Sequence, residues 1–167
     1  MTAKLIPIAA LVALAVTANA QVTGFRIRAG YGWSGSINSR HLQGPEVGLD
    51  FPVQKLPLVE IDFTADWLMG GQLVHGGDLD GNVYRFLLSA RAQIPGAKVS
   101  VFGGLGWATA QSRGGQFASI NGEVMQLGVG FPLGMKTPLL APSLEVAGTF
   151  ASKSGLSGFN VSLAVHF

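Results

Sequence analysis

The chain has 167 residues, a length that predicts a single domain. Hydrophobic residues make up 48% of it and charged residues only 12%, about half the charged share of an ordinary soluble domain. The formal net charge of +2, without a basic run, argues against a nucleic-acid partner. Because the chain has no cysteine, disulfides and thiolate metal sites are excluded.

The N-terminal segment has the pattern of a secretory signal peptide. Lys4 supplies a basic start, residues 5–16 (LIPIAALVALAV) form an apolar core, and Ala18-Asn19-Ala20 is an A-x-A cleavage site. The core is shorter than the about 20 residues of a bilayer-spanning helix. We therefore expect residues 1–20 to be removed and residues 21–167 to form one exported domain.

From Gln21 onward, eight segments alternate large apolar residues with small or polar ones, which is the period of a strand buried on one face. None of them sustains the 3.6-residue period of a helix. The fifth is the least regular, because Phe102 falls on its small-residue face and Gly103 on its apolar face. The segments cover residues 25–33, 46–53, 59–67, 82–94, 99–107, 122–131, 142–150 and 158–167.

The connections between these segments are of two kinds. Those after the second, fourth and sixth are short and contain proline, in the sequences QKLP, PGAK and PLGMKTP. Those after the first, third and fifth are longer, and residues 151–157 follow the seventh. Alternate connections of a meander lie at the same end, so one end has tight turns and the other has loops. An exported, charge-poor chain of this kind can enter a membrane as a closed barrel. The sequence thus predicts an all-β fold, an eight-stranded antiparallel up-and-down transmembrane β-barrel.

Large aromatic residues fall at two levels of this barrel. Phe25 and Trp33 are eight positions apart, and eight residues of a tilted strand span roughly 20 Å, close to the apolar band of an outer-membrane barrel. A soluble barrel turned inside out would have the same alternation. Two aromatic girdles and uneven connections favour lipid outside. The predicted girdles consist of Trp33, Trp67, Trp107 and Phe150 at the loop end, and of Phe25, Phe51, Phe131 and Phe167 at the turn end.

The last ten residues, GFNVSLAVHF, alternate up to the final side chain. Over residues 21–167 the chain resembles the small eight-stranded outer-membrane barrels of the opacity-protein and OmpX-like superfamily. The resemblance implies a bacterial outer-membrane location, periplasmic termini and turns, and extracellular loops. It also implies that the final strand is the signal read by the barrel assembly machinery. Activity is not implied, because these barrels include adhesins, enzymes and structural proteins. The expected assembly signal is Phe159, Val161, Leu163, Val165 and Phe167.

The inward faces of the predicted strands carry an unusual set of charges. Unpaired charges in a narrow interior cost several kcal/mol each, so we expect one connected network. In the third and fourth segments, a register whose residue numbers sum to 151 places Asp66 opposite Arg85 and Glu60 opposite Arg91, and predicts two ion pairs. The network is expected to be either a structural polar plug or a gate that passes ions. Its members are Arg26, Arg28, Glu46, Asp50, Glu60, Asp62, Asp66, Arg85, Arg91 and Glu145.

The sequence does not support an enzyme. His41 and His75 fall in loops, His166 faces inward, and no outward serine lies near any of them. A G-x-S-x-G elbow is absent. Asp78 and Asp80 lack the ligand spacing of a calcium loop, which favours a turn over a metal site. We expect no cofactor.

The three remaining loops each carry one cation, Arg40, Arg113 or Lys153. These cations are either solvated or meet phosphates of lipopolysaccharide. The expected partners are therefore outer-membrane lipid, lipopolysaccharide and the assembly machinery. The expected role is that of a monomeric barrel with a structural or permeability function, and the alternative is surface binding or adhesion through the loops.

Overall fold

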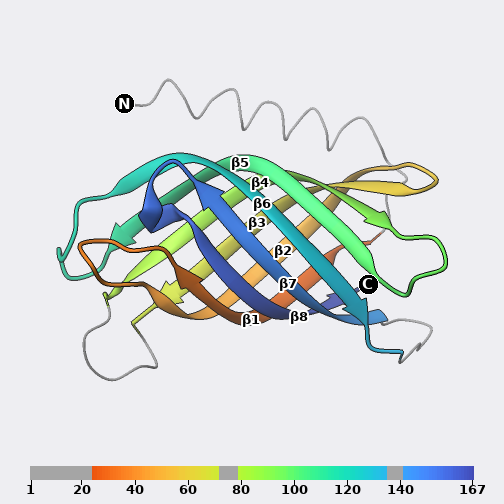
Figure 1. The fold of residues 1–167 in the computed structure, drawn as a ribbon, viewed down its shortest axis with the longest axis horizontal. Helices are drawn as coiled ribbons and strands as arrows, with labels where there is room; N and C mark the ends of the chain where they lie inside the picture. Colours follow the sequence, from red (N-terminus) through yellow and green to blue (C-terminus); the bar gives the residue numbers. More distant parts are fainter. Residues whose placement is uncertain (1–23, 72–78, 135–140) are drawn as a thin grey trace.

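A computed structural model describes residues 24–71, 79–134 and 141–167. The predicted signal peptide, His75 and Asp78 lie outside these residues. Within these ranges the chain forms eight strands and one short 3-10 helix, η1, in the connection between the last two strands (Figure 1). The elements are β1 Arg26–Ser34, β2 Gln43–Lys55, β3 Val59–Gly70, β4 Gly81–Gln93, β5 Ser100–Ser112, β6 Ile120–Pro132, β7 Ala141–Ala151, η1 Ser154–Leu156 and β8 Gly158–His166.

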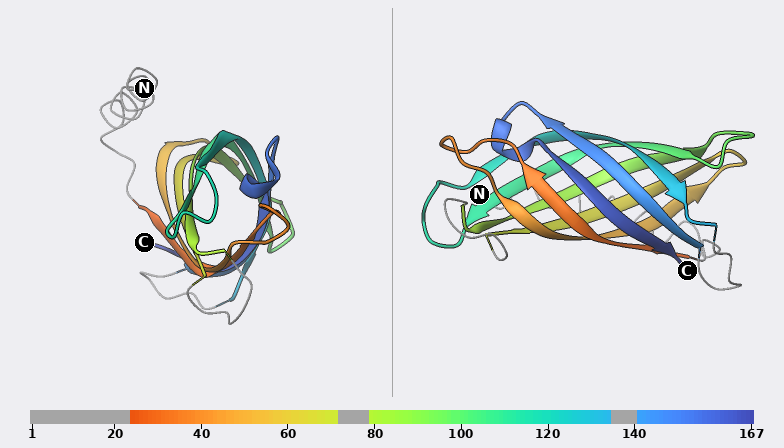
Figure 2. Two further views of the ribbon diagram at one scale, coloured as in Figure 1. Left: turned by 90° about the vertical axis from the view of Figure 1, so that its left-hand side faces the viewer. Right: turned by 60° about the horizontal axis from the view of Figure 1, so that its bottom comes forward.

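The strands form one closed barrel in sequence order, and every neighbouring pair is antiparallel. Seen from one end, they make a complete ring (Figure 2). The ring closes where β1 pairs with β8, from Arg26 opposite His166 to Ser34 opposite Gly158. This confirms the predicted eight-stranded up-and-down fold. Closure leaves no edge strand with unpaired backbone groups.

Several strands extend past the predicted boundaries at the loop end. β2 begins at Gln43, three residues earlier than expected, and β5 continues to Ser112, five residues beyond the expected segment. The alternation of apolar residues stops before the ladder does, because backbone pairing does not require an apolar side chain. The hydrogen-bonded barrel is therefore taller than the apolar band from which it was predicted.

The two faces of the barrel wall differ as the alternation indicates. The eight predicted girdle residues all lie on the outer face with 37–54% of their surface exposed. Leu88, Leu105 and Leu127, in mid-strand, are at least half exposed. In the described part of the chain, no helix has the length and apolar character needed to cross a membrane. The buried side chains of the described residues are concentrated inside the ring of strands.

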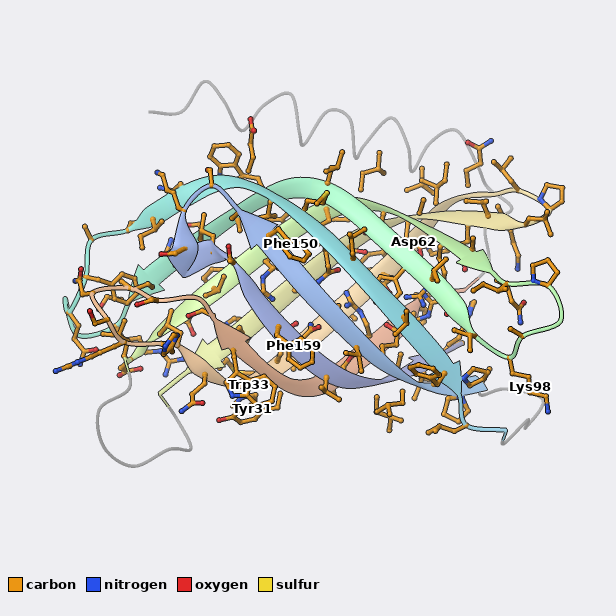
Figure 3. The ribbon with its side chains drawn as sticks, viewed as in Figure 1. Tyr31, Trp33, Asp62, Lys98, Phe150 and Phe159 are labelled. Atoms are coloured by element: carbon orange, nitrogen blue, oxygen red, sulfur yellow. The ribbon has the colours of Figure 1, made fainter. Side chains whose placement is uncertain are left out.

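Aromatic contacts join strands on the outer face. Trp33 lies between Tyr31, also on β1, and Phe159 of β8. The ring centroid of Trp33 is 4.8 Å from that of Tyr31 and 5.9 Å from that of Phe159 (Figure 3). Trp67 and Tyr84 stack across β3 and β4 with centroids 6.1 Å apart. Both clusters lie near the loop end of their strands, where the sequence predicts a girdle.

Candidate functional site: the charged barrel interior

The barrel interior contains all ten of the charged residues that the sequence assigns to it. Eight have at most 8% of their surface exposed. The other two, Glu60 and Arg91, lie nearer the turn end, with side-chain exposures of 17% and 11%. The ten charged residues come from five strands: Arg26 and Arg28 from β1, Glu46 and Asp50 from β2, Glu60, Asp62 and Asp66 from β3, Arg85 and Arg91 from β4, and Glu145 from β7. Alternate side chains of each strand point inward, and closure of the barrel brings those of the five strands together.

The largest group of charges surrounds the two arginines of β1. Arg28 Nη2 donates to Asp66 Oδ1 at 2.6 Å and to Asp50 Oδ1 at 2.9 Å. Arg26 lies 3.3 Å from Asp50 and 3.4 Å from Glu60. Asp62 is the fourth carboxylate, 3.6 Å from Arg26. Two guanidinium groups thus hold four carboxylates, which ties β1, β2 and β3 together from the inside.

Two further ion pairs connect strands that are not neighbours. Arg85 on β4 donates to Glu46 on β2 at 3.0 Å, and the amide of Asn160 on β8 donates to the other oxygen of Glu46. Arg91 on β4 lies 2.9 Å from Glu145 on β7. Such pairs cross the interior, so they hold the ring at a fixed width.

Arg91 also explains the irregular fifth segment. Its guanidinium lies over the ring of Phe102, 4.3 Å from the ring centroid. Phe102 is 7% exposed and points into the barrel, as its place in the alternation indicates. A cation over an aromatic face is a favourable contact in a site without water. Phe102 therefore belongs to the interior as a partner of the ion network.

The predicted register between β3 and β4 is confirmed, but the predicted ion pairs are wrong. Asp66 lies opposite Arg85, and Glu60 opposite Arg91, as expected. Asp66 nevertheless pairs with Arg28, Arg85 with Glu46, and Glu60 with Arg26. In a barrel of eight strands the wall is strongly curved, so long inward side chains reach across the interior as well as along the wall, where Arg26 pairs with its ladder neighbour Asp50. Register fixes which backbones pair and leaves side-chain partners open.

Glycines on the inner face make room for these charges. Gly48 on β2 faces the Arg28–Asp66 ion pair, and a Cβ at this position would lie 3.0 Å from Arg28 Nη2 and closer still to Asp66 Oδ1. Gly32 on β1 stands in the same relation to the Glu46 carboxylate. Small residues on the inner face thus leave the space that the large charged side chains occupy.

A small cavity lies within the network. A cavity of about 10 Å³ is lined by Asp50, Asp62, Thr64, Gln126 and their neighbours. A single water needs about this volume. Among the residues that the structure describes, no group of three or more histidine and acidic side chains is arranged to hold a metal ion.

The loop end of the interior is apolar, a feature that the sequence analysis missed. Buried side chains from the strand ends and from all four loops pack into one cluster, here called the apolar cap. Leu68, Val83 and Leu87 could have been found, because they occupy inward positions of β3 and β4. The loop residues carry no periodic signal. The apolar cap consists of Ile37, Leu42, Leu68, Leu79, Val83, Leu87, Ala108, Ala110, Phe117, Val124 and Leu156.

The loops that supply the apolar cap are bonded to one another. Asn38 and Ser39 have φ angles of 50° and 64°, which form a tight turn that places Ile37 opposite Arg40. The first loop is hydrogen-bonded to the fourth, because Gly35 N–H donates to the carbonyl oxygen of Ser157 at 2.7 Å. Leu79 N–H of the second loop donates to the carbonyl oxygen of His41 in the first at 3.1 Å. Arg113 N–H of the third loop donates to the carbonyl oxygen of Asp80 in the second at 3.0 Å. The described loop residues therefore form a connected lid over the apolar cap.

Two of the three histidines, His41 and His166, lie in the described part of the chain. His41 Nδ1 lies 3.1 Å from the backbone oxygen of Ser34, within the first loop. His166 ends β8 at the turn end, beside Arg26 of β1 in the ladder. Each of these two histidines thus has a place in the loop or strand structure.

A closed eight-stranded meander with a charged interior and an apolar exterior is the fold of small outer-membrane barrels, as the sequence resemblance implies. Neisserial surface protein A has this fold. Its crystal structure matches with a TM-score of 0.55 at 14% identity, over 87% of this chain and 98% of that one.

Two other outer-membrane proteins match less closely. The Yersinia pestis protein Ail, in a phospholipid nanodisc, matches with a TM-score of 0.48 at 15% identity, over 87% of this chain and 100% of that one. The N-terminal barrel domain of Pseudomonas aeruginosa OprF matches with a TM-score of 0.45 at 14% identity, over 86% and 96%. No family model matches the sequence, and no curated protein matches it at the sequence level.

Proposed function

We propose that this protein is an integral barrel of the bacterial outer membrane whose interior is closed and whose role is structural. The observation that carries the proposal is the apolar cap stacked on the ion network. An ion entering from the loop end would meet buried side chains such as Leu42, Leu68 and Leu156, each with 0% exposure, before reaching the ion network. Below them, a cavity among the charges has a volume of about 10 Å³.

The membrane location rests on the outer surface. Leu105, in mid-strand, is 67% exposed and Phe150 is 54% exposed, which would be costly in water over a whole barrel wall. The likeness in fold to Neisserial surface protein A supports the same conclusion. In this arrangement, both termini and the short turns are periplasmic, and the loops are extracellular. The monomeric barrel is surrounded by lipid, with lipopolysaccharide at the outer rim.

The lid favours a structural role over surface binding. An adhesive loop needs side chains and backbone that are free to meet a partner. Here the first and fourth loops are joined by Ser154 Oγ donating to Ser36 O at 2.7 Å, in addition to their backbone bond. Ile37 and Phe117 point inward and are 5% and 8% exposed. The loops therefore use much of their surface to close the barrel.

Single-channel recording in planar bilayers tests this proposal. We expect the wild-type barrel to show no discrete conductance steps, because neither the apolar cap nor the ion network leaves a continuous path. A variant that opens only the cap, Phe117→Ala with Leu156→Ala, is the matched control and should also stay silent, because the ion network below it is intact. Discrete steps in the wild-type protein would assign a permeability role instead.

A further inference from the structure

An open apolar groove runs across the outer surface of β5, β6 and β7. Its volume is about 440 Å³, and Val101, Leu127, Val129, Val146 and Gly148 line it, with Gly128 and the inward Phe102 at its floor. In the register of these strands, Val101 lies opposite Val129, and Val129 opposite Val146. The groove is thus a continuous hollow across three neighbouring strands of the barrel wall.

The hollow lies beside Leu127 on the side of β7, where Gly148 has no side chain. Gly148 lies opposite Leu127 in the ladder, whereas Gly103 on β5, the glycine on the other side, is covered by Leu127, since a Cβ there would lie 2.9 Å from Leu127 Cδ2. A Cβ at Gly148 would meet only the ring of Phe150, at 3.4 Å, which is an ordinary contact. The strand would therefore accept a larger residue at Gly148. Folding of the barrel does not require glycine at this position, and the missing side chain leaves the hollow open for a ligand.

The groove lies within the predicted apolar band. Along β6, Leu127 and Val129 directly precede Phe131 of the turn-end girdle on the outer face, and along β7, Gly148 directly precedes Phe150 of the loop-end girdle. A ligand at this level must be apolar. An acyl chain of a surrounding lipid has both the chemistry and the shape of an open groove.

The charge at the turn end selects among lipids. Each short turn of the sequence has one lysine, Lys55, Lys98 or Lys136, and residues 52–58, 94–99 and 133–140 contain no aspartate or glutamate. Lys98 is exposed and three positions before Val101, at the end of the groove nearest the turns. Figure 3 shows its side chain beyond the strands at that end of the barrel. A lysine there complements a phosphate at the membrane surface.

We propose that the groove binds an anionic glycerophospholipid of the periplasmic leaflet. One acyl chain lies against Leu127, Val129 and Val146 in the hollow left by Gly148, and the phosphate group meets Lys98. This inference rests on the proposed membrane location and its orientation, and it adds a specific lipid site to the barrel wall.

Native mass spectrometry of the full barrel tests the site. The protein is inserted into vesicles of phosphatidylcholine and phosphatidylglycerol in equal parts, then released in mild detergent, and the retained lipids are counted. We expect one phosphatidylglycerol per barrel. Lys98→Gln should reduce the preference for phosphatidylglycerol over phosphatidylcholine about fivefold, the effect of one lysine near a charged surface. Gly148→Leu should abolish retention of either lipid, because its side chain fills the hollow.

Matched controls separate this site from general effects. Lys55→Gln removes a lysine at the same end but between β2 and β3, and Ala65→Leu enlarges an outward residue on β3; both should retain lipid as the wild type does. Equal retention of the two lipids by the wild type, no retained lipid, or a dimer in place of the lipid would overturn the inference. Failure to insert into vesicles, seen as loss of the heat-modifiable band on a gel, would reject the proposed function as well. A folded barrel without lipid rejects only the site.

Discussion

The rings of Phe25 and Phe167 stack with centroids 5.0 Å apart and planes 15° from parallel, so the first and last aromatic residues of the barrel are in contact. The backbone N–H of Phe167 donates to the carbonyl oxygen of Phe25 at 3.0 Å. These contacts close the β1–β8 seam at the turn end. Phe167 therefore contributes to closure directly, apart from the assembly signal that the family resemblance implies.

Deleting Phe167 should impair membrane insertion, because the deletion removes the stack, the hydrogen bond and one girdle residue together. The aromatic pair alone is worth about 0.5–1.5 kcal/mol beyond the area that it buries. The heat-modifiable band in outer-membrane fractions measures the folded amount. Deletion of Gly114 and Gly115, in an exposed loop tip, is the control and should fold nearly as the wild type does. Equal folding of both variants would mean that the seam closes without Phe167.

A charge placed on the outer face of β8 tests what surrounds the barrel. Leu163 is 46% exposed and lies opposite Ala29 and Leu144 in mid-wall. Leu163→Arg should reduce the free energy of unfolding by about 2–4 kcal/mol in a bilayer, since the charge lies near its centre. Leu163→Val keeps the position apolar and should be nearly silent. Urea unfolding in lipid vesicles measures both. An arginine as harmless as the valine would mean that this face meets water.

Much of the wall could be predicted from the sequence because alternation and register are local properties. A period of two assigns each side chain to a face, and Asp66 lies opposite Arg85 as the charges suggested. The ion pairs could not be predicted, because Arg91 and Glu145 come from strands that only closure brings within 2.9 Å of each other.

The apolar cap was missed for a related reason. Phe117 and Ile37 lie in irregular loops, and only the folded chain shows that they turn inward. A loop has no regular spacing of apolar residues, so its sequence does not show which side chains turn inward. The loop end of the barrel interior was thus the part with the least sequence signal.

The inner-face glycine at position 48 should tolerate no side chain. Gly48→Ala would press a methyl group against Asp66 Oδ1 and Arg28 Nη2, both held in a buried ion pair. Overpacking of this kind costs about 1–3 kcal/mol. Urea unfolding in vesicles measures the loss. Gly148→Ala, on the outer face of another strand, is the matched control and should cost much less, because its Cβ makes only an ordinary contact. Equal losses would mean that strand propensity, and not the ion pair, sets the cost.

The last prediction concerns which charges act together. Arg28 and Asp66 are 2.6 Å apart, with side-chain exposures of 4% and 1%, while Arg85 lies opposite Asp66 in the ladder but pairs with Glu46. Arg28→Ala should cost about 3–5 kcal/mol, because it leaves buried carboxylates without their partner. Combining it with Asp66→Asn should recover part of that loss.

A second cycle, Arg85→Ala with Asp66→Asn, separates contact from register. We expect a coupling energy of about 0.5–3 kcal/mol for Arg28 with Asp66, the range for residues in contact. The coupling of Arg85 with Asp66 should be clearly smaller, since those two side chains have other partners. Unfolding free energies of the single and double variants in the same vesicles give both values. If the Arg85 cycle showed the larger coupling, the charges would pair along the wall, and the cross-barrel network that fixes the width of the ring would be rejected.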